Sequence, residues 1–164
     1  MDKMTIFAPN QDDMGAYINI GNYGFQSVRN GEYVDKSGLI SIVNNMLFTE
    51  RRFACVSRSR RFGKSVAAKM LCAYYDQSCD SRSLFEDLEI AKDPSFEKHL
   101  NKYPVIYLDL TDFITRVRDA GIVDMMDAVM LRDISEDYPD IPVQTGDSLM
   151  DYLFRVTKAT GLPF

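Results

Sequence analysis

The stretch Phe53–Ser65 reads F-A-C-V-S-R-S-R-R-F-G-K-S and decides which fold the sequence predicts. Its first four residues are apolar, and the following stretch, Val66–Tyr75, is amphipathic. This order predicts a strand, a loop and a helix, with G-K-S at the turn into the helix. Because a helix N-terminus carries unpaired backbone N–H groups and a partial positive charge, the turn predicts a phosphate site.

The turn only partly matches the phosphate-loop pattern G-x-x-x-x-G-K-[ST], because Arg58 stands where the first glycine belongs. Either the loop takes another conformation, or guanidinium groups replace part of the amide cradle, which three neighbouring arginines favour. The bland alternative is a helix start whose G-K-S is accidental. The residues expected to hold the phosphates are Arg58, Ser59, Arg60, Arg61, Phe62, Gly63, Lys64, Ser65 and Val66.

A second apolar run, Val105–Leu108, ends in Asp109 and predicts a strand buried on both faces. Helices are expected over residues 36–49, 66–75, 93–101, 114–133 and 148–160, after an irregular segment 1–34. Strands that alternate with helices imply parallel pairing. The predicted fold class is therefore α/β, a parallel-sheet, phosphate-loop NTPase-like α/β/α core over residues 35–164.

Composition places the chain among globular proteins. Its 164 residues are 46% apolar and 26% charged, enough for one sizeable core. No apolar run is long enough to span a membrane and the N-terminus lacks a secretory pattern, so we expect a cytoplasmic protein without a membrane partner. Three cysteines without a C-x-x-C pair predict reduced thiols, with Cys55 and Cys72 buried. The single histidine, His99, is expected at the surface.

Charge is distributed unevenly along the chain. The formal net charge of −5 and a pI of about 4.9 predict repulsion from nucleic acid and anionic membranes. Between Arg51 and Lys69, however, there are seven basic residues and no acid. This segregation suits a local anion site better than a broad nucleic-acid face.

Three strings together resemble the bacterial AAA-ATPase-like family: Y-V-D-K-S at Tyr33–Ser37, the basic loop Ser57–Ser65, and Y-P-V-I-Y-L-D at Tyr103–Asp109. The resemblance covers nearly the whole chain. It implies that the basic loop binds nucleotide, that ATP and Mg²⁺ are the cofactors, and that a nuclease-like domain of the PD-(D/E)XK type often follows. Nucleic acid is therefore an implied partner of the family.

Hydrolysis also needs a carboxylate near the magnesium ion. Asp109 is the candidate at a strand end, so Lys64 and Asp109 are the expected catalytic residues, and Ser65 and Asp109 the expected metal ligands. The resemblance, however, places an Asp-Glu strand after a T-G-L-P-F-like segment, and Thr160–Phe164 is where this chain stops. We therefore expect a domain incomplete at its C-terminus, with weak nucleotide binding, negligible turnover and self-association through sheet edges.

Three functions are consistent with these observations: an ATP-binding ATPase module, a non-catalytic module for a phosphorylated ligand, and an accessory whose basic loop touches a nucleic-acid backbone. The sequence has no N-K-x-D string to read guanine, which favours ATP.

Overall fold

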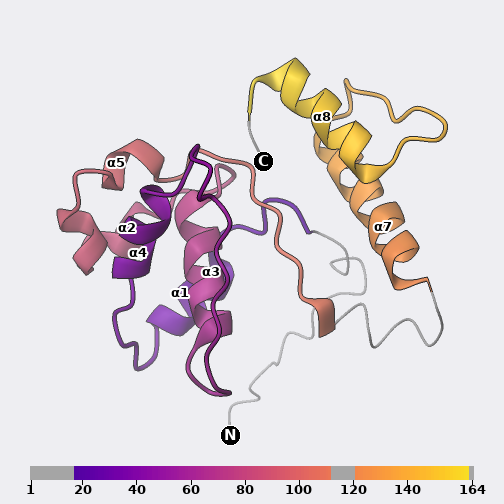
Figure 1. The fold of residues 1–164 in the computed structure, drawn as a ribbon. Coiled ribbons are helices and arrows are strands. Elements are labelled where there is room, and N and C mark those ends of the chain that lie inside the picture. Colours follow the sequence, from indigo (N-terminus) through magenta and orange to yellow (C-terminus); the bar gives the residue numbers. More distant parts are fainter. Residues whose placement is uncertain (1–16, 112–120, 163–164) are drawn as a thin grey trace, which may run out of the picture.

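The computed structural model describes residues 17–111 and 121–162, whose helices form two groups (Figure 1). The first group contains α1 (Tyr23–Arg29), α2 (Gly38–Asn44), α3 (Lys64–Tyr75), α4 (Arg82–Phe85), the 3-10 helix η2 (Glu89–Lys92) and α5 (Phe96–His99). The second contains α7 (Ile122–Asp137) and α8 (Leu149–Thr160), which pack side by side. The segment that follows α5 runs between the two groups.

The predicted parallel sheet is wrong for the described part of the chain, which contains no strand. Two isolated bridges occur instead, antiparallel between Ile18 and Ile106 and parallel between Asp76 and Tyr103. The expected strand Val105–Leu108 pairs only briefly with the chain near Ile18. The residues of the expected strand at 52–56 have no regular secondary structure and are exposed, with Phe53 82% exposed. Apolar runs become a sheet only where neighbours satisfy their backbone groups.

Aromatic rings hold the first group together. The Phe25 ring stacks on Phe85 at 5.1 Å between centroids, and the Tyr33 ring meets Phe25 edge-on at 5.4 Å. Tyr74 of α3 contacts Phe85 edge-on at 5.5 Å and is fully buried. These rings bring α1, α3 and α4 into one core, because large apolar side chains contribute most of the burial energy.

A buried polar cluster fixes α2 against α3 and α5. The Asn44 side chain donates to the Tyr74 hydroxyl at 3.2 Å and to Ser95 Oγ at 2.8 Å, and it accepts from the Tyr75 hydroxyl at 2.6 Å. The Tyr74 hydroxyl in turn donates to the Phe96 carbonyl at 2.8 Å. Because every member has a partner, the cluster avoids the cost of an unsatisfied buried polar group.

The second group is a helical hairpin with well-defined ends. Ser148 and Asp151 form a capping box at the start of α8, and Gly161 ends the helix in the left-handed conformation. The shared core of this group consists of Ile18, Met130, Ile134, Tyr152 and Val156. The helix predicted for residues 148–160 is thus confirmed, including its terminating glycine.

The remaining helical predictions meet mixed outcomes. The helix predicted for 66–75 is confirmed as α3, which begins two residues earlier. The helix expected over 36–49 is limited to α2, and that expected over 93–101 to the single turn α5. The first part of the helix expected over 114–133 lies outside the described residues. In the described part, α7 begins at Ile122 and continues past the expected end to Asp137. Tyr23–Arg29 forms a helix, α1, where irregular chain was expected.

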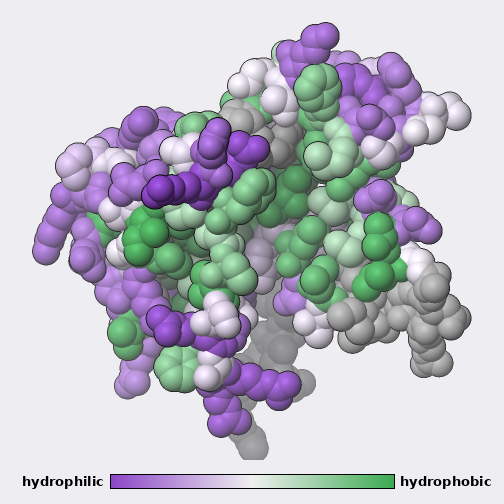
Figure 2. All heavy atoms as spheres, in the orientation of Figure 1, coloured by the Kyte–Doolittle hydropathy of each residue, from purple (hydrophilic) through white to green (hydrophobic). Residues whose placement is uncertain are grey.

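Apolar side chains are also exposed on the face drawn in Figure 2, where hydrophobic residues gather between the two helical groups and hydrophilic ones surround them. Exposed large apolar residues of the described chain include Phe48, Phe53, Val56 and Phe62. Self-association through such a surface stays a prediction.

Among the described residues, none of the helices has the length and apolar character needed to cross a membrane.

Candidate functional site

The candidate site is built on the first turn of α3. Gly63 precedes this helix and has φ 76° and ψ 26°, the left-handed conformation that favours glycine. No side chain caps the turn, and the first helical backbone bond runs from the Ala67 N–H to the Gly63 carbonyl at 2.9 Å. The amides of Lys64, Ser65 and Val66 precede that bond, so they are suited to receive an anion.

The basic loop curls around the Lys64 ammonium. Lys64 Nζ donates to the Arg58 carbonyl at 2.7 Å and to the Ser59 carbonyl at 3.2 Å. Within the same loop Arg61 has φ 67°, a conformation that is uncommon for a non-glycine residue. The Arg58 position, where a phosphate loop usually has glycine, therefore provides a carbonyl that holds the lysine.

A cavity of about 420 Å³ opens beside this turn. Three of the residues that line it carry positive charge, none carries negative charge, and the others are apolar or glycine. The lining residues are Lys36, Leu39, Val56, Arg58, Phe62, Gly63, Lys64 and Ala67. A cavity with cationic groups, apolar walls and a helix start suits a phosphorylated ligand with an apolar part.

Lys36 belongs to this site although the sequence did not identify it as a site residue. Its Nζ donates to the Phe62 carbonyl at 2.9 Å. A Cβ added at Gly63 would stand 2.7 Å from the same Nζ, so the ammonium lies directly against the glycine. The only signal for it in the sequence was its place in the Y-V-D-K-S string.

Asp109 stands apart from the loop. It is exposed, and its carboxylate accepts a hydrogen bond from the Thr111 backbone N–H at 3.0 Å. Within the described ranges no hydrogen bond joins Asp109 to the loop. The hydroxyl and backbone N–H of Thr111 lower the pKa of the Asp109 carboxyl, and the positive charge of Lys69 on α3 lowers it further. Asp109 is thus ionised and electrically coupled to the helix that carries the site.

The other predicted residues are less engaged. Ser59, Arg60, Arg61 and Ser65 are exposed, and none of them lines the cavity. Over residues 17–111 and 121–162, no group of three or more acidic, histidine or cysteine side chains is arranged to hold a metal. An all-protein metal cage is therefore not part of the described structure.

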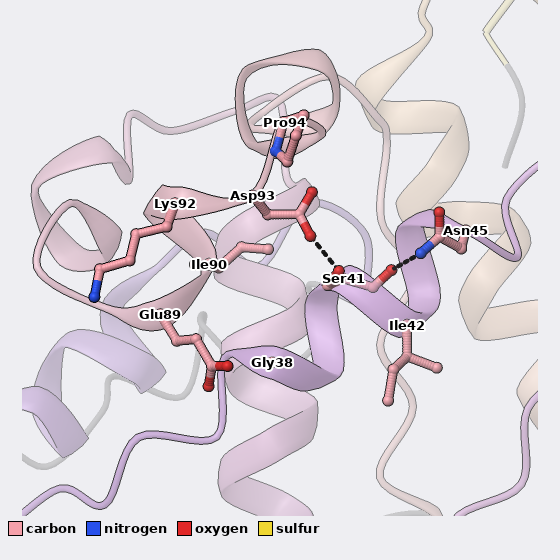
Figure 3. A pocket seen from close by; sticks show the side chains of 9 residues that line it. All are labelled: Gly38, Ser41, Ile42, Asn45, Glu89, Ile90, Lys92, Asp93 and Pro94. Carbon is pink, nitrogen blue, oxygen red and sulfur yellow. Dashed lines mark hydrogen bonds between the residues drawn. The ribbon is translucent and has the colours of Figure 1, made fainter.

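Two other cavities differ from the first in charge. The larger, about 460 Å³, lies between α2 and η2 and is lined by Glu89, Asp93 and Lys92 among others (Figure 3). The smaller, about 250 Å³, is lined by apolar and aromatic residues around Tyr103. Because a polyphosphate requires net positive surroundings, the cavity at Gly63 suits it best among these three cavities of the described residues.

Two predictions about polar residues need correction. His99 is 3% exposed rather than at the surface, and its Nδ1 lies 2.6 Å from the Tyr103 hydroxyl. Burial lowers the pKa of His99, with a smaller effect from Lys98. Cys55 was expected to be buried but is exposed, since its segment has no sheet to join. Cys72 is buried as predicted, and burial raises the pKa of its thiol to about 11.

A cationic cavity at the start of a Gly-Lys-Ser helix is the kind of site found in nucleotide-binding proteins. Comparison with known proteins agrees with this class, because a family model described as "Predicted AAA-ATPase" matches residues 18–159. The chain belongs to this AAA-ATPase-like family, whose general role is ATPase-like nucleotide binding. No curated protein and no solved structure matches the chain.

Proposed function

We propose that this chain binds ATP with Mg²⁺, and that the phosphates lie at the turn Arg58–Ser65. One observation carries the proposal: Lys36, Arg58 and Lys64 line a single cavity against the left-handed Gly63 that starts α3. Family membership supports a nucleotide as the ligand. A polyphosphate there meets both the partial positive charge of the helix and discrete cations.

Lys64 has the central role in this proposal. Its ammonium is held by the carbonyls of Arg58 and Ser59, at a position where phosphate oxygens can replace them. Exchange of neutral carbonyls for phosphate oxygens strengthens these contacts, because the attraction between opposite charges is added to the hydrogen bonds. The Arg58, Arg60 and Arg61 guanidinium groups supply further positive charge, and the amides near Gly63 bind the phosphates.

The oxygen donors fit magnesium rather than a softer metal. Ser65 supplies a hydroxyl on the first turn of α3, and Asp109 supplies an ionised carboxylate coupled to Lys69 of the same helix. Magnesium keeps several waters and takes one or two protein oxygens together with substrate phosphates. Ser65 and Asp109 are therefore proposed to hold it, where it would neutralise phosphate charge. With Lys64, Asp109 is the proposed catalytic residue.

Calorimetry tests the proposal. ATP with magnesium should bind the native chain and should lose at least tenfold in affinity with Lys64→Ala, because about 1.4 kcal/mol corresponds to a factor of ten. Lys158→Ala is the matched control, since Lys158 is an exposed lysine on α8, away from the cavity. Equal affinities for native chain and Lys64→Ala would refute the proposal. Phosphate release by the native chain is expected to be slow, and a rate that Asp109→Asn lowers further would support the catalytic role of Asp109.

A second candidate function rests on exposure. Every residue from Arg51 to Phe62 is exposed, including five arginines that a nucleic-acid backbone could reach. Single-stranded DNA should then bind with a steep salt dependence that is lost when Arg58, Arg60 and Arg61 are changed to Gln. If that variant keeps its affinity and salt slope, this alternative is wrong.

A further inference from the structure

Of the Y-V-D-K-S string, only Lys36 enters the function proposed above, as one of the cations that line the cavity. The residues on either side of Lys36, Asp35 and Ser37, both accept hydrogen bonds from the backbone of η2. The Asp35 carboxylate accepts from the backbone N–H groups of Ser37 at 2.7 Å and Glu89 at 2.8 Å. Ser37 is fully buried, and its hydroxyl accepts from the Ile90 N–H at 3.1 Å. The backbone around Lys36 is therefore held in place.

A tyrosine connects the same string to α3. The Tyr33 hydroxyl accepts from the Lys36 backbone N–H at 3.3 Å and donates to Met70 Sδ at 3.3 Å. The Tyr33 ring packs edge-on against Phe25 in the aromatic core, so its position is determined by the core itself. The Tyr33 hydroxyl therefore fixes the backbone of Lys36 relative to α3, the helix whose first turn forms the site.

Further support comes from the contact between α2 and η2, drawn in Figure 3. Ser41 of α2 donates to the Asp93 carboxylate just after η2, and the Glu89 carboxylate lies 3.3 Å from the position of a Cβ on Gly38. These contacts prevent α2 from sliding along η2. Since Lys36 is separated from this helix only by Ser37, its side chain starts from a fixed point.

From this fixed point the Lys36 side chain reaches the phosphate turn. Its Nζ donates to the Phe62 carbonyl and stands against Gly63. The Phe62 carbonyl and the Gly63 N–H belong to one planar peptide, so a bond to the carbonyl also orients that N–H. A lysine with a preset backbone loses less freedom in making such a bond than one on a mobile segment.

We propose that Lys36 is a positioning residue of the phosphate turn: it holds the Phe62–Gly63 peptide, and so sets the geometry in which the turn receives a polyphosphate. The ligand part of this inference rests on the proposed nucleotide function. The positioning part concerns the chain without ligand and can be measured separately. If Lys36 had no such role, its replacement would leave the turn unchanged.

The first experiment measures the turn without ligand. An arginine-specific protease cuts after Arg60 and Arg61, and Lys36→Met does not alter its recognition sites. Cleavage there should be about five- to tenfold faster in Lys36→Met than in the native chain, because cleavage follows the population of the open turn. Lys36→Arg keeps a donor but adds a cleavage site at position 36, so the fragments are identified by mass; cleavage after Arg60 and Arg61 should be slow again in this variant, and Lys158→Met should match the native chain. Circular dichroism shows that each variant is folded.

The second experiment measures ATP and magnesium binding to the same variants by calorimetry. Lys36→Met should weaken binding about five- to tenfold while Lys36→Arg recovers most of the loss. Native cleavage rates in Lys36→Met overturn the inference, and so does native affinity in that variant. If the native chain binds no ATP but the cleavage contrast persists, the proposed function fails while the positioning role of Lys36 is supported.

Discussion

Replacement of Gly63 by alanine tests the geometry of the site through stability alone. Gly63 and Gly161 are both left-handed glycines at helix ends, with φ 76° and 72°. Alanine in this conformation costs about 1–2 kcal/mol, so both substitutions share this term. Gly161→Ala is therefore a matched control for the backbone strain in Gly63→Ala.

The two positions differ in what the new Cβ meets. At Gly161 no atom of the described chain beyond its neighbouring residues lies within 4 Å, whereas at Gly63 the Lys36 Nζ stands 2.7 Å away. The ammonium must shift, and we expect this shift to break its 2.9 Å bond to the Phe62 carbonyl. An exposed hydrogen bond of this kind contributes about 0.5–1.5 kcal/mol. Gly63→Ala should therefore lower the free energy of unfolding by about 1.5–3.5 kcal/mol, more than Gly161→Ala does.

Equilibrium urea denaturation of a double-mutant cycle measures this difference. In a Lys36→Met background the bond is already lost, so Gly63→Ala should cost only the about 1–2 kcal/mol of backbone strain. The reasoning is refuted if Gly63→Ala costs no more than Gly161→Ala in the native chain. It is equally refuted if the excess cost persists when Lys36 is methionine.

Three further predictions concern the core, a helix end and pH. Phe25→Ala should lower the free energy of unfolding by about 3–5 kcal/mol, because Phe25 is fully buried. Phe154→Ala, at a 73% exposed position, should change it by less than about 0.5 kcal/mol. Denaturant titration measures both, and equal effects would contradict the assigned core. Ser148→Ala should cost about 1 kcal/mol through loss of its bond to the Asp151 N–H, seen as a lower thermal midpoint. Burial lowers the pKa of His99, so the folded state disfavours the protonated imidazole. The free energy of unfolding should therefore fall as pH drops below the ordinary histidine pKa of about 6.5, and His99→Asn should remove that dependence between about pH 7 and 5. An unchanged pH profile in the variant would exclude His99 as its source.

Helices with local signals were predictable from the sequence. The end of α8 follows from Gly161, and its start follows from Ser148 with an acidic residue at the third helical position. The start of α3 at G-K-S was also predictable from a local signal, because a glycine before a helical pattern affects only the backbone of the residues next to it. α1 was missed because Gly24 and the flanking Asn22 and Asn30 disfavour a helix, whereas packing of Phe25 in the core overrides that preference.

The sheet was not predictable because strand formation depends on a distant partner. Val105–Leu108 and the segment around Phe53 have the apolar composition of strands. In the structure the first makes a single bridge and the second is exposed. Composition sets how readily a segment can join a sheet, but the neighbouring backbone decides whether it does.

The candidate site divides in the same way. The sequence by itself determined the glycine turn that starts α3 at Gly63-Lys64-Ser65, because the backbone freedom of glycine and the helix start are local properties. Only the tertiary structure placed Lys36 on the Phe62 carbonyl, 26 residues away, and buried His99 beside Tyr103. Contacts between segments distant in the sequence depend on how the helices pack, and that packing is a property of the whole core.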